Sequence, residues 1–317
     1  MDTVFKWLLG IWGVLVLSAD VFMGSGKYGD VLLALSLLTI IWGLLISLSS
    51  TDIRRILMGL DVSVNGFAVL SAALMVLCGE SNTFAIRSAV YMLIVSSLSV
   101  FVLYLVALEQ VRKINTYEIK GLIASGKGNR LLMVVCFIAC ATIAGAPGTI
   151  GFLAYSMMYK AIVTIIEWKW LVVLYILVWA FLMTAATRVF MKFFVSKKDE
   201  TVRVLSEKEK EEEDAQEDEQ AKNPYLFGEI LLLVVGILQI VVGVIPGVTV
   251  DKVADSINAF FHGPDFIDAL DYYTSDALIG LGIAVALAIV LYVNLVHGIL
   301  LRAIKDKKTK KIQKDME

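Results

Sequence analysis

The chain alternates between long apolar stretches and short charged segments. Eight windows of about 20 apolar residues, the length that crosses a bilayer as a helix, fall near 5–23, 31–49, 56–78, 88–108, 131–158, 169–194, 228–250 and 277–299. Hydrophobic residues make up 58% of the 317 residues, and the mean hydropathy is +0.79. The pattern predicts an all-α polytopic membrane protein with about eight transmembrane helices.

Positive charges indicate how these helices are oriented. Arg54 and Arg55 follow the second span, the basic segment 112–130 follows the fourth, and the lysines of 197–203 follow the sixth. All of them share one side with the lysine-rich tail, and lysine and arginine are enriched in cytoplasmic loops. We therefore expect a multi-pass protein of the inner, cytoplasmic cell membrane with both termini in the cytoplasm.

The same pattern divides the chain into four parts. Residues 1–195 hold membrane helices, 196–225 form a charged cytoplasmic loop, 226–300 hold two further membrane helices around an exterior loop at 251–276, and 301–317 form a basic tail. The loop 196–225 has too few apolar residues for a core. A solvated helix or linker and a docking surface for a soluble partner are both compatible with it.

One predicted span is interrupted. Its centre reads Ile-Ala-Gly-Ala-Pro-Gly-Thr-Ile-Gly-Phe over 143–152, with Gly145, Pro147, Gly148 and Gly151 where a helix should be continuous. Proline removes a backbone donor, and lipid cannot satisfy the freed polar groups, so the break must face protein or a wet cavity. Transporters handle ions at such breaks near the membrane midplane. The break is therefore the first candidate functional element.

Few ionisable groups lie inside the predicted spans, where each costs about 2.5–3.5 kcal/mol on insertion scales. Asp61 and Asn65, four residues apart, share a helix face that should point into the bundle. They are compatible with a proton or cation site, or with a carboxylate that is bonded to a neighbouring subunit or to Arg55. Their pairing marks them as candidates for an ion path.

The remaining polar groups lie near span ends or stand alone. Lys160 is expected near the exterior end of its span, and Arg188 near a cytoplasmic end, where it can snorkel. Gln239 is expected to bond across helices. The cysteines and histidines have no metal-ligand spacing, and a net charge of −2 gives no sign of a nucleic-acid partner. We therefore expect no metal, no cofactor and no nucleic acid.

Three segments together resemble one known family. They are the turn and following helix at 48–57 and 66–67, the serine-rich stretch 96–101, and the Gly-Leu loop at 121–122 with the broken helix 144–152. They resemble the C-terminal half of the antiporter-like, proton-translocating membrane subunits of respiratory complex I. The most similar type is chain N, or subunit 2, which is shared with energy-converting hydrogenases and multisubunit sodium/proton antiporters. The resemblance is best over 30–195.

The resemblance implies a subunit without redox chemistry or cofactor of its own, in an NADH:quinone oxidoreductase-like or hydrogenase-like translocase. Its partners would be other antiporter-like and membrane subunits and a soluble redox arm. Where the family's broken helix carries a lysine, this chain has Tyr155, and the family histidine falls on Val64, whereas Arg188 matches a family arginine. These differences predict at most a partial ion path, with Asp61, Asn65, Tyr155, Lys160 and Arg188 as candidates. A non-transporting scaffold and half of a split cation/proton antiporter are the alternatives.

Overall fold

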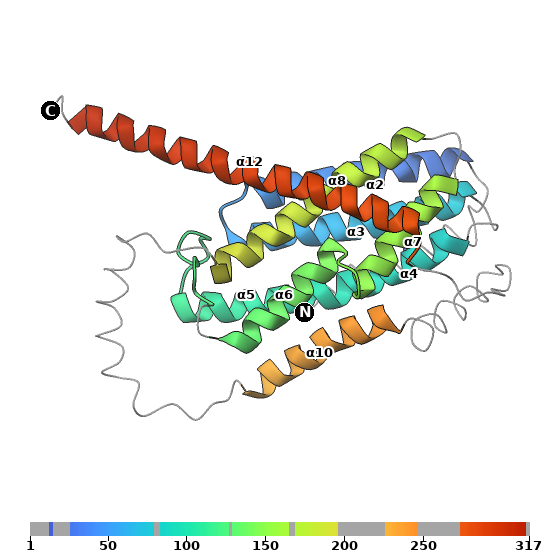
Figure 1. Ribbon diagram of the computed structural model, residues 1–317, viewed down its shortest axis with the longest axis horizontal. Helices are drawn as coiled ribbons and strands as arrows, with labels where there is room; N and C mark the ends of the chain where they lie inside the picture. The colour runs from blue at the N-terminus through green and yellow to red at the C-terminus, as the bar shows by residue number, and fades with distance from the viewer. Residues whose placement is uncertain are drawn as a thin grey trace.

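The computed structural model describes residues 13–14, 26–78, 83–126, 129–164, 169–195, 226–245 and 273–314. Within these ranges the regular structure is helical apart from one isolated antiparallel bridge between Asp52 and Glu118 (Figure 1). The predicted all-α membrane fold is confirmed. Most of the first predicted span, the loop 196–225 and most of the loop 251–276 lie outside the described residues.

Five of the described helices are long and apolar enough to cross a membrane. They are α2 (Gly26–Ser49), α3 (Ile53–Cys78), α4 (Thr83–Val95) continued by a π-helical turn (Ser96–Val100) into α5 (Phe101–Ile114), α8 (Lys169–Phe190) continued by a π-helical turn (Met191–Val195), and α12 (Ser275–Lys314). Three shorter apolar helices are α6 (Arg130–Ala144), α7 (Ile150–Thr164) and α10 (Leu226–Val244).

Two helices differ in outline from the prediction. In the fourth span, the hydroxyls of Ser96 and Ser97 both donate to the Leu93 carbonyl, at 3.0 and 2.6 Å. Such side-chain bonds compete with the backbone ladder and accompany the π-helical turn here. Helix α12 runs on to Lys314 and extends beyond the other helices in Figure 1, because its lysine-rich end has strong helix formers and no glycine or proline.

Close backbone contacts hold the bundle together. A Cβ at Gly43 of α2 would lie 2.6 Å from the carbonyl oxygen of Gly59 of α3. Small residues of this kind allow membrane helices to approach closely. Helix α4 packs along α7, α8 contacts α12, and α10 lies on α6 and α7. The largest fully buried side chains are Trp179, Tyr91, Tyr155, Tyr175, Phe67, Phe152 and Phe193.

The connections that follow α2 and α5 meet the last turn of α8 at one end of the bundle. The Ile53 N–H donates to the Tyr117 carbonyl at 2.9 Å, and the Ala124 N–H donates to the Lys192 carbonyl at 3.0 Å. These contacts place the two connections, with Arg54 beside the first and Lys120 in the second, next to Lys192 in the last turn of α8. Positive charges of three segments distant in sequence therefore gather at one end of the described bundle.

Candidate functional site

The fifth predicted span is broken between Ala144 and Ile150, where α6 ends and α7 begins. Gly145 closes α6 with φ of 75°, and its N–H donates to the Thr142 carbonyl at 3.0 Å. Gly148 has φ of 81°. Glycine adopts this left-handed region without the steric cost that a Cβ brings. Two of the four residues assigned to the break therefore interrupt the helix there, and Pro147 lies between them.

The start of α7 lies directly against the end of α6. A Cβ at Gly151 would overlap the carbonyl oxygen of Thr142, and backbone cannot move aside as a flexible side chain can. Helix α10 covers the break from another side, since a Cβ at Gly243 would lie 2.6 Å from Cα of Thr149. Main chain thus packs on main chain around the break, as a discontinuous helix in a membrane requires.

A tryptophan from α8 satisfies one carbonyl at the break. The Trp179 Nε1–H donates to the carbonyl of Ala144, the last residue of α6, at 3.0 Å. The final carbonyls of a helix have no intrahelical donor, so a partner from another element stabilises the end. Trp179 cannot be recognised from the sequence, because its partner lies 35 residues away and no local motif links the two.

Tyr155 lies beside the break within a cluster of aromatic rings. Its ring stacks on Trp179, with centroids 5.0 Å apart and planes at 20°, and meets Phe67 of α3 edge to face at 5.4 Å. A Cβ at Gly145 would lie 2.6 Å from Cδ2 of Tyr155, so the glycine also makes room for the ring. The Tyr155 carbonyl accepts a hydrogen bond of 2.8 Å from the Tyr175 hydroxyl.

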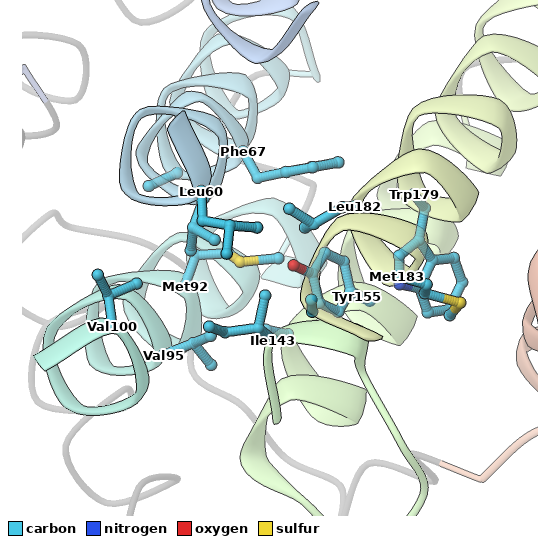
Figure 2. Packing of buried hydrophobic residues seen from close by; sticks show 14 of the residues in the cluster. Leu60, Phe67, Met92, Val95, Val100, Ile143, Tyr155, Trp179, Leu182 and Met183 are labelled. Carbon is cyan, nitrogen blue, oxygen red and sulfur yellow. The ribbon is translucent and has the colours of Figure 1, made fainter. Parts of the chain in front are cut away.

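The hydroxyl of Tyr155 itself is fully buried and has no hydrogen-bond partner in the described part of the chain. Figure 2 shows it directed among the apolar side chains of Leu60, Met92 and Leu182. An unsatisfied buried hydroxyl costs about 1–3 kcal/mol. The position where the resemblance expects a lysine is therefore occupied by a neutral side chain in apolar surroundings.

Asp61 and Asn65 pair along α3. The Asn65 Nδ2–H donates to Oδ1 of Asp61 at 2.9 Å. Asn65 is buried, whereas Asp61 is only half-buried on the side of the bundle, so the pair does not point wholly inward as expected. No ion pair between described residues joins Asp61 to Arg55, whose side chain is exposed. Asp61 lies within electrostatic range of the Tyr104 phenol on α5.

Lys160 is half-buried near the end of α7. Its Nζ lies 5.6 Å from the centroid of the Phe84 ring of α4, within the range of a cation–π contact. This places the lysine at the end of α7 that lies away from the break. Lys160 thus lies near an end of its helix, where the sequence predicts it.

Arg188 binds the end of α2. Its guanidinium donates to the carbonyls of Ser47, Leu48 and Ser50, at 3.0, 2.6 and 3.1 Å, and the residue is 8% exposed. The expectation that Arg188 snorkels towards water is wrong, because the negative end of the α2 dipole and its orphan carbonyls hold the cation inside the bundle. The bonded carbonyls lie 138–141 positions away in the sequence, so no local pattern identifies them.

The candidates do not form one connected chain. Among the placed residues, no hydrogen bond or ion pair joins Tyr155, Asp61 and Arg188 to one another. Gln239 of α10 does bond across helices as predicted, since Ser99 donates to its Oε1 at 3.2 Å. The search for metal-ligating clusters, limited to the described residues, finds none.

A mainly apolar cavity of about 290 Å³ lies beside the break, between α8 and α12. It is lined by Ala144, Ala146, Pro147, Met183, Thr184, Thr187, Leu281, Val285, Ala288, Ile289 and Tyr292. The cavity brings no charged side chain to the break.

Comparison with known proteins agrees with this architecture. A search of curated protein sequences finds no match. Among solved structures, a chain in the structure of the Mrp complex from Dietzia sp. DQ12-45-1b is similar, with a TM-score of 0.68 and 16% sequence identity. The match covers 90% of the present chain and 29% of that chain, and at this identity it supports the fold alone.

Sequence comparison identifies the family directly. The family model described as "NADH:quinone oxidoreductase/Mrp antiporter, TM" matches residues 5–184, which is more than half of the chain. This range includes the helices around Asp61, the break at Pro147 and most of α8. The chain therefore belongs to the NADH:quinone oxidoreductase/Mrp antiporter transmembrane family.

Proposed function

We propose that the chain is an antiporter-like subunit of a proton- or sodium-translocating membrane complex of the respiratory or hydrogenase type, and that it contributes at most a partial ion path. Family membership and the broken helix support the antiporter-like part of this proposal. The protein would lie in the cytoplasmic membrane with both termini in the cytoplasm, as the positive charges of its loops favour.

The environment of the Tyr155 hydroxyl is the observation that limits the proposal to a partial ion path. A proton relay needs groups that exchange hydrogen bonds in series, with water or with each other. The Tyr155 hydroxyl is buried among apolar side chains without a partner in the part of the chain that the structure describes. A continuous relay through the broken helix would therefore need another carrier than Tyr155.

Asp61 and Asn65 are the best remaining candidates for a partial path. They form the one hydrogen-bonded carboxylate–amide pair that the structure describes inside a membrane span. Arg188 is less suited to proton transfer, since an arginine stays protonated and this one donates to three carbonyls at the end of α2. Lys160 lies at the end of α7 far from the break.

Partners are part of the proposal. The similar solved chain belongs to an Mrp complex, and the present chain aligns with only 29% of it. We propose that other antiporter-like and membrane subunits surround this chain in its own complex. A soluble redox arm would contact the cytoplasmic side, where the loop 196–225 is its candidate docking segment.

The apolar surroundings of Tyr155 also favour a second candidate function, a scaffold that does not transport ions. In that case the broken helix would serve packing alone, as the contacts of Gly151 and Gly243 allow. Half of a split antiporter remains the third candidate, in which a separate chain supplies the missing charged residues.

The first experiment is purification of the tagged protein from its native membrane in mild detergent, followed by mass spectrometry of what accompanies it. We expect quinone-reductase, hydrogenase or antiporter-type subunits. Recovery alone, or with unrelated proteins, would overturn the complex-subunit proposal.

The second experiment measures ion translocation by the purified complex in vesicles. Among complexes that retain the chain, Asp61→Asn should lower the translocation rate, and Tyr155→Phe should leave it unchanged. A normal rate in the Asp61→Asn complex would favour the scaffold instead. A reduced rate in the Tyr155→Phe complex would place Tyr155 on the path and contradict the argument from its unpaired hydroxyl.

A further inference from the structure

Helices α3 and α5 share one side of the bundle, which we call the α3/α5 face. It consists of Met58, Asp61, Val62, Tyr104, Leu105 and Leu108, all of them exposed or half-buried. Asp61 lies eight residues after the start of α3, about 12 Å along the helix, at a depth inside the membrane span. A carboxylate is thus partly exposed on the described bundle at the depth of a membrane span.

The outer side of α2 offers a comparison within the described bundle. Its exposed large residues are Val31, Leu35, Leu38, Ile41, Trp42 and Leu45. These side chains are apolar or aromatic, the kinds that lipid tolerates, and the exposed Thr39 beside them donates its hydroxyl to the Leu35 carbonyl at 2.8 Å. The α3/α5 face differs from it by a carboxylate at membrane depth, with the Tyr104 phenol nearby, and that difference needs a cause.

Asp61 has unused capacity for hydrogen bonds. A carboxylate offers about four acceptor sites, and the only side-chain donor to Asp61 among the described residues is Asn65. No lysine or arginine of the described ranges forms an ion pair with it. Lipid chains supply no donors. A protein side chain from outside the described bundle is the group that would complete this site.

The charge of Asp61 also selects the kind of partner. A second copy of this chain that bound by the same face about a two-fold axis would place one Asp61 opposite the other. Like charges in apposition across an interface disfavour association. A lysine or arginine on a different protein offers the opposite charge and the missing donors together.

We propose that the α3/α5 face is a subunit interface that receives a transmembrane helix of a different membrane subunit, with a lysine or arginine side chain opposite Asp61. This inference rests on the proposed function, because it names the surface by which the chain joins its complex. It also accounts for the single carboxylate on the α3/α5 face, whose other side chains are apolar apart from the Tyr104 phenol.

The test places a photo-reactive amino acid, p-benzoylphenylalanine, at Leu108 of the full chain in its native membrane. The matched control carries it at Leu38 on α2; these two leucines are 45% and 65% exposed. After irradiation, the adducts are digested and sequenced. From Leu108 we expect a transmembrane peptide of a different subunit that contains a lysine or arginine, and from Leu38 we expect lipid adducts.

Substitution at Asp61 then tests the charge pair. Asp61→Leu should lower the yield of the Leu108 adduct by about tenfold or more, since loss of one partner of a buried charge pair weakens association strongly. Asp61→Lys should restore the adduct only when the basic residue found in the partner helix is changed to aspartate. Thermal unfolding of the purified Asp61→Leu protein shows whether it remains folded.

Several outcomes would overturn the proposal that the α3/α5 face is a subunit interface. They are adducts from Leu108 that contain only lipid, a second copy of this chain, residues 1–25 of the same chain, or a partner helix without a basic residue. An unchanged adduct yield in the folded Asp61→Leu protein would do the same. If other complex subunits still co-purify in these cases, the proposed function stands and only this interface fails; if the chain purifies alone, the proposed function fails as well.

Discussion

The hydroxyl of Tyr175 donates to the main-chain carbonyl of Tyr155 at 2.8 Å, whereas the hydroxyl of Tyr155 has no partner among the described residues. Both side chains are fully buried. Two fully buried tyrosines in one aromatic cluster thus differ in whether the phenol is hydrogen-bonded. This difference makes them a matched pair for measuring what a buried hydroxyl contributes.

Tyr155→Phe should leave the protein as stable as before or stabilise it by about 1 kcal/mol, because removal of an unsatisfied hydroxyl relieves its desolvation cost. Tyr175→Phe should destabilise by about 1 kcal/mol through loss of one hydrogen bond. Thermal unfolding in detergent compares the two variants with the unaltered protein. A larger loss from Tyr155→Phe than from Tyr175→Phe would mean that the Tyr155 hydroxyl has a partner, such as water.

Gly151→Ala should disrupt the break. The new Cβ would overlap the Thr142 carbonyl, and the contact is between main-chain segments of α6 and α7 that cannot give way independently. We expect destabilisation of about 3 kcal/mol or more, at the upper end of overpacking effects, or failure to accumulate in the membrane.

Gly282→Ala on α12 is the control for this substitution. Its Cβ would meet no atom within 4 Å, so alanine should be neutral or stabilise by about 0.5–1 kcal/mol through its higher helix propensity. Equal behaviour of Gly151→Ala and Gly282→Ala in thermal unfolding would contradict the close approach at the break.

The Asp52–Arg54 pair at the basic end of the bundle predicts a pH dependence. Arg54 donates to both carboxylate oxygens of Asp52, at 3.2 and 2.8 Å, and these bonds lower the pKa of Asp52 below its ordinary value of 3.8. A lowered pKa in the folded state means stabilisation that is present above the unfolded pKa and lost as the pH falls through the folded one.

We therefore expect the thermal stability of the unaltered protein to exceed that of Asp52→Asn at pH 7 by a small margin, because the pair lies at the surface. The margin should shrink once the pH falls below about 4. Arg54→Gln should remove the same margin at pH 7 and show the same loss of pH dependence. A margin that stays constant down to pH 3 would contradict the assignment to Asp52.

The sequence predicts those features that local pattern determines. Span positions follow from apolar length, the break follows from glycine and proline at 145–151, and the Asp61–Asn65 pair follows from a spacing of four residues on a helix. Each of these depends on residues within a few turns of one another, for which helix geometry alone gives the answer.

The features that the sequence does not predict depend on contacts between distant segments. Arg188 lies in a span where snorkelling is the simplest expectation, yet the end of α2 receives its guanidinium. No local sequence pattern indicates that Trp179 donates a hydrogen bond to Ala144. The unpaired hydroxyl of Tyr155 follows from three helices that enclose it, and only their packing reveals that the site is apolar.

The contact of Arg188 with α2 predicts that this arginine acts through stability. Arg188→Met leaves the carbonyls of Ser47, Leu48 and Ser50 without their donors, and we expect a loss of about 2 kcal/mol or more, since hydrogen bonds from charged groups are worth about 1.5–3 kcal/mol each. The stability of Arg188→Lys should lie between that of the unaltered protein and that of Arg188→Met, because an ammonium lacks the planar fork that spans several acceptors.

Arg55→Gln serves as the control for these two variants, because Arg55 is exposed on the side of α3 and surface changes stay within about 0.5 kcal/mol. Thermal unfolding and ion translocation should both be measured on the same purified preparations. A helix-capping role predicts that translocation falls only as far as the folded fraction falls. If Arg188→Met lowers translocation while its unfolding matches that of Arg55→Gln, then Arg188 belongs to the ion path, and the cap at the end of α2 is secondary.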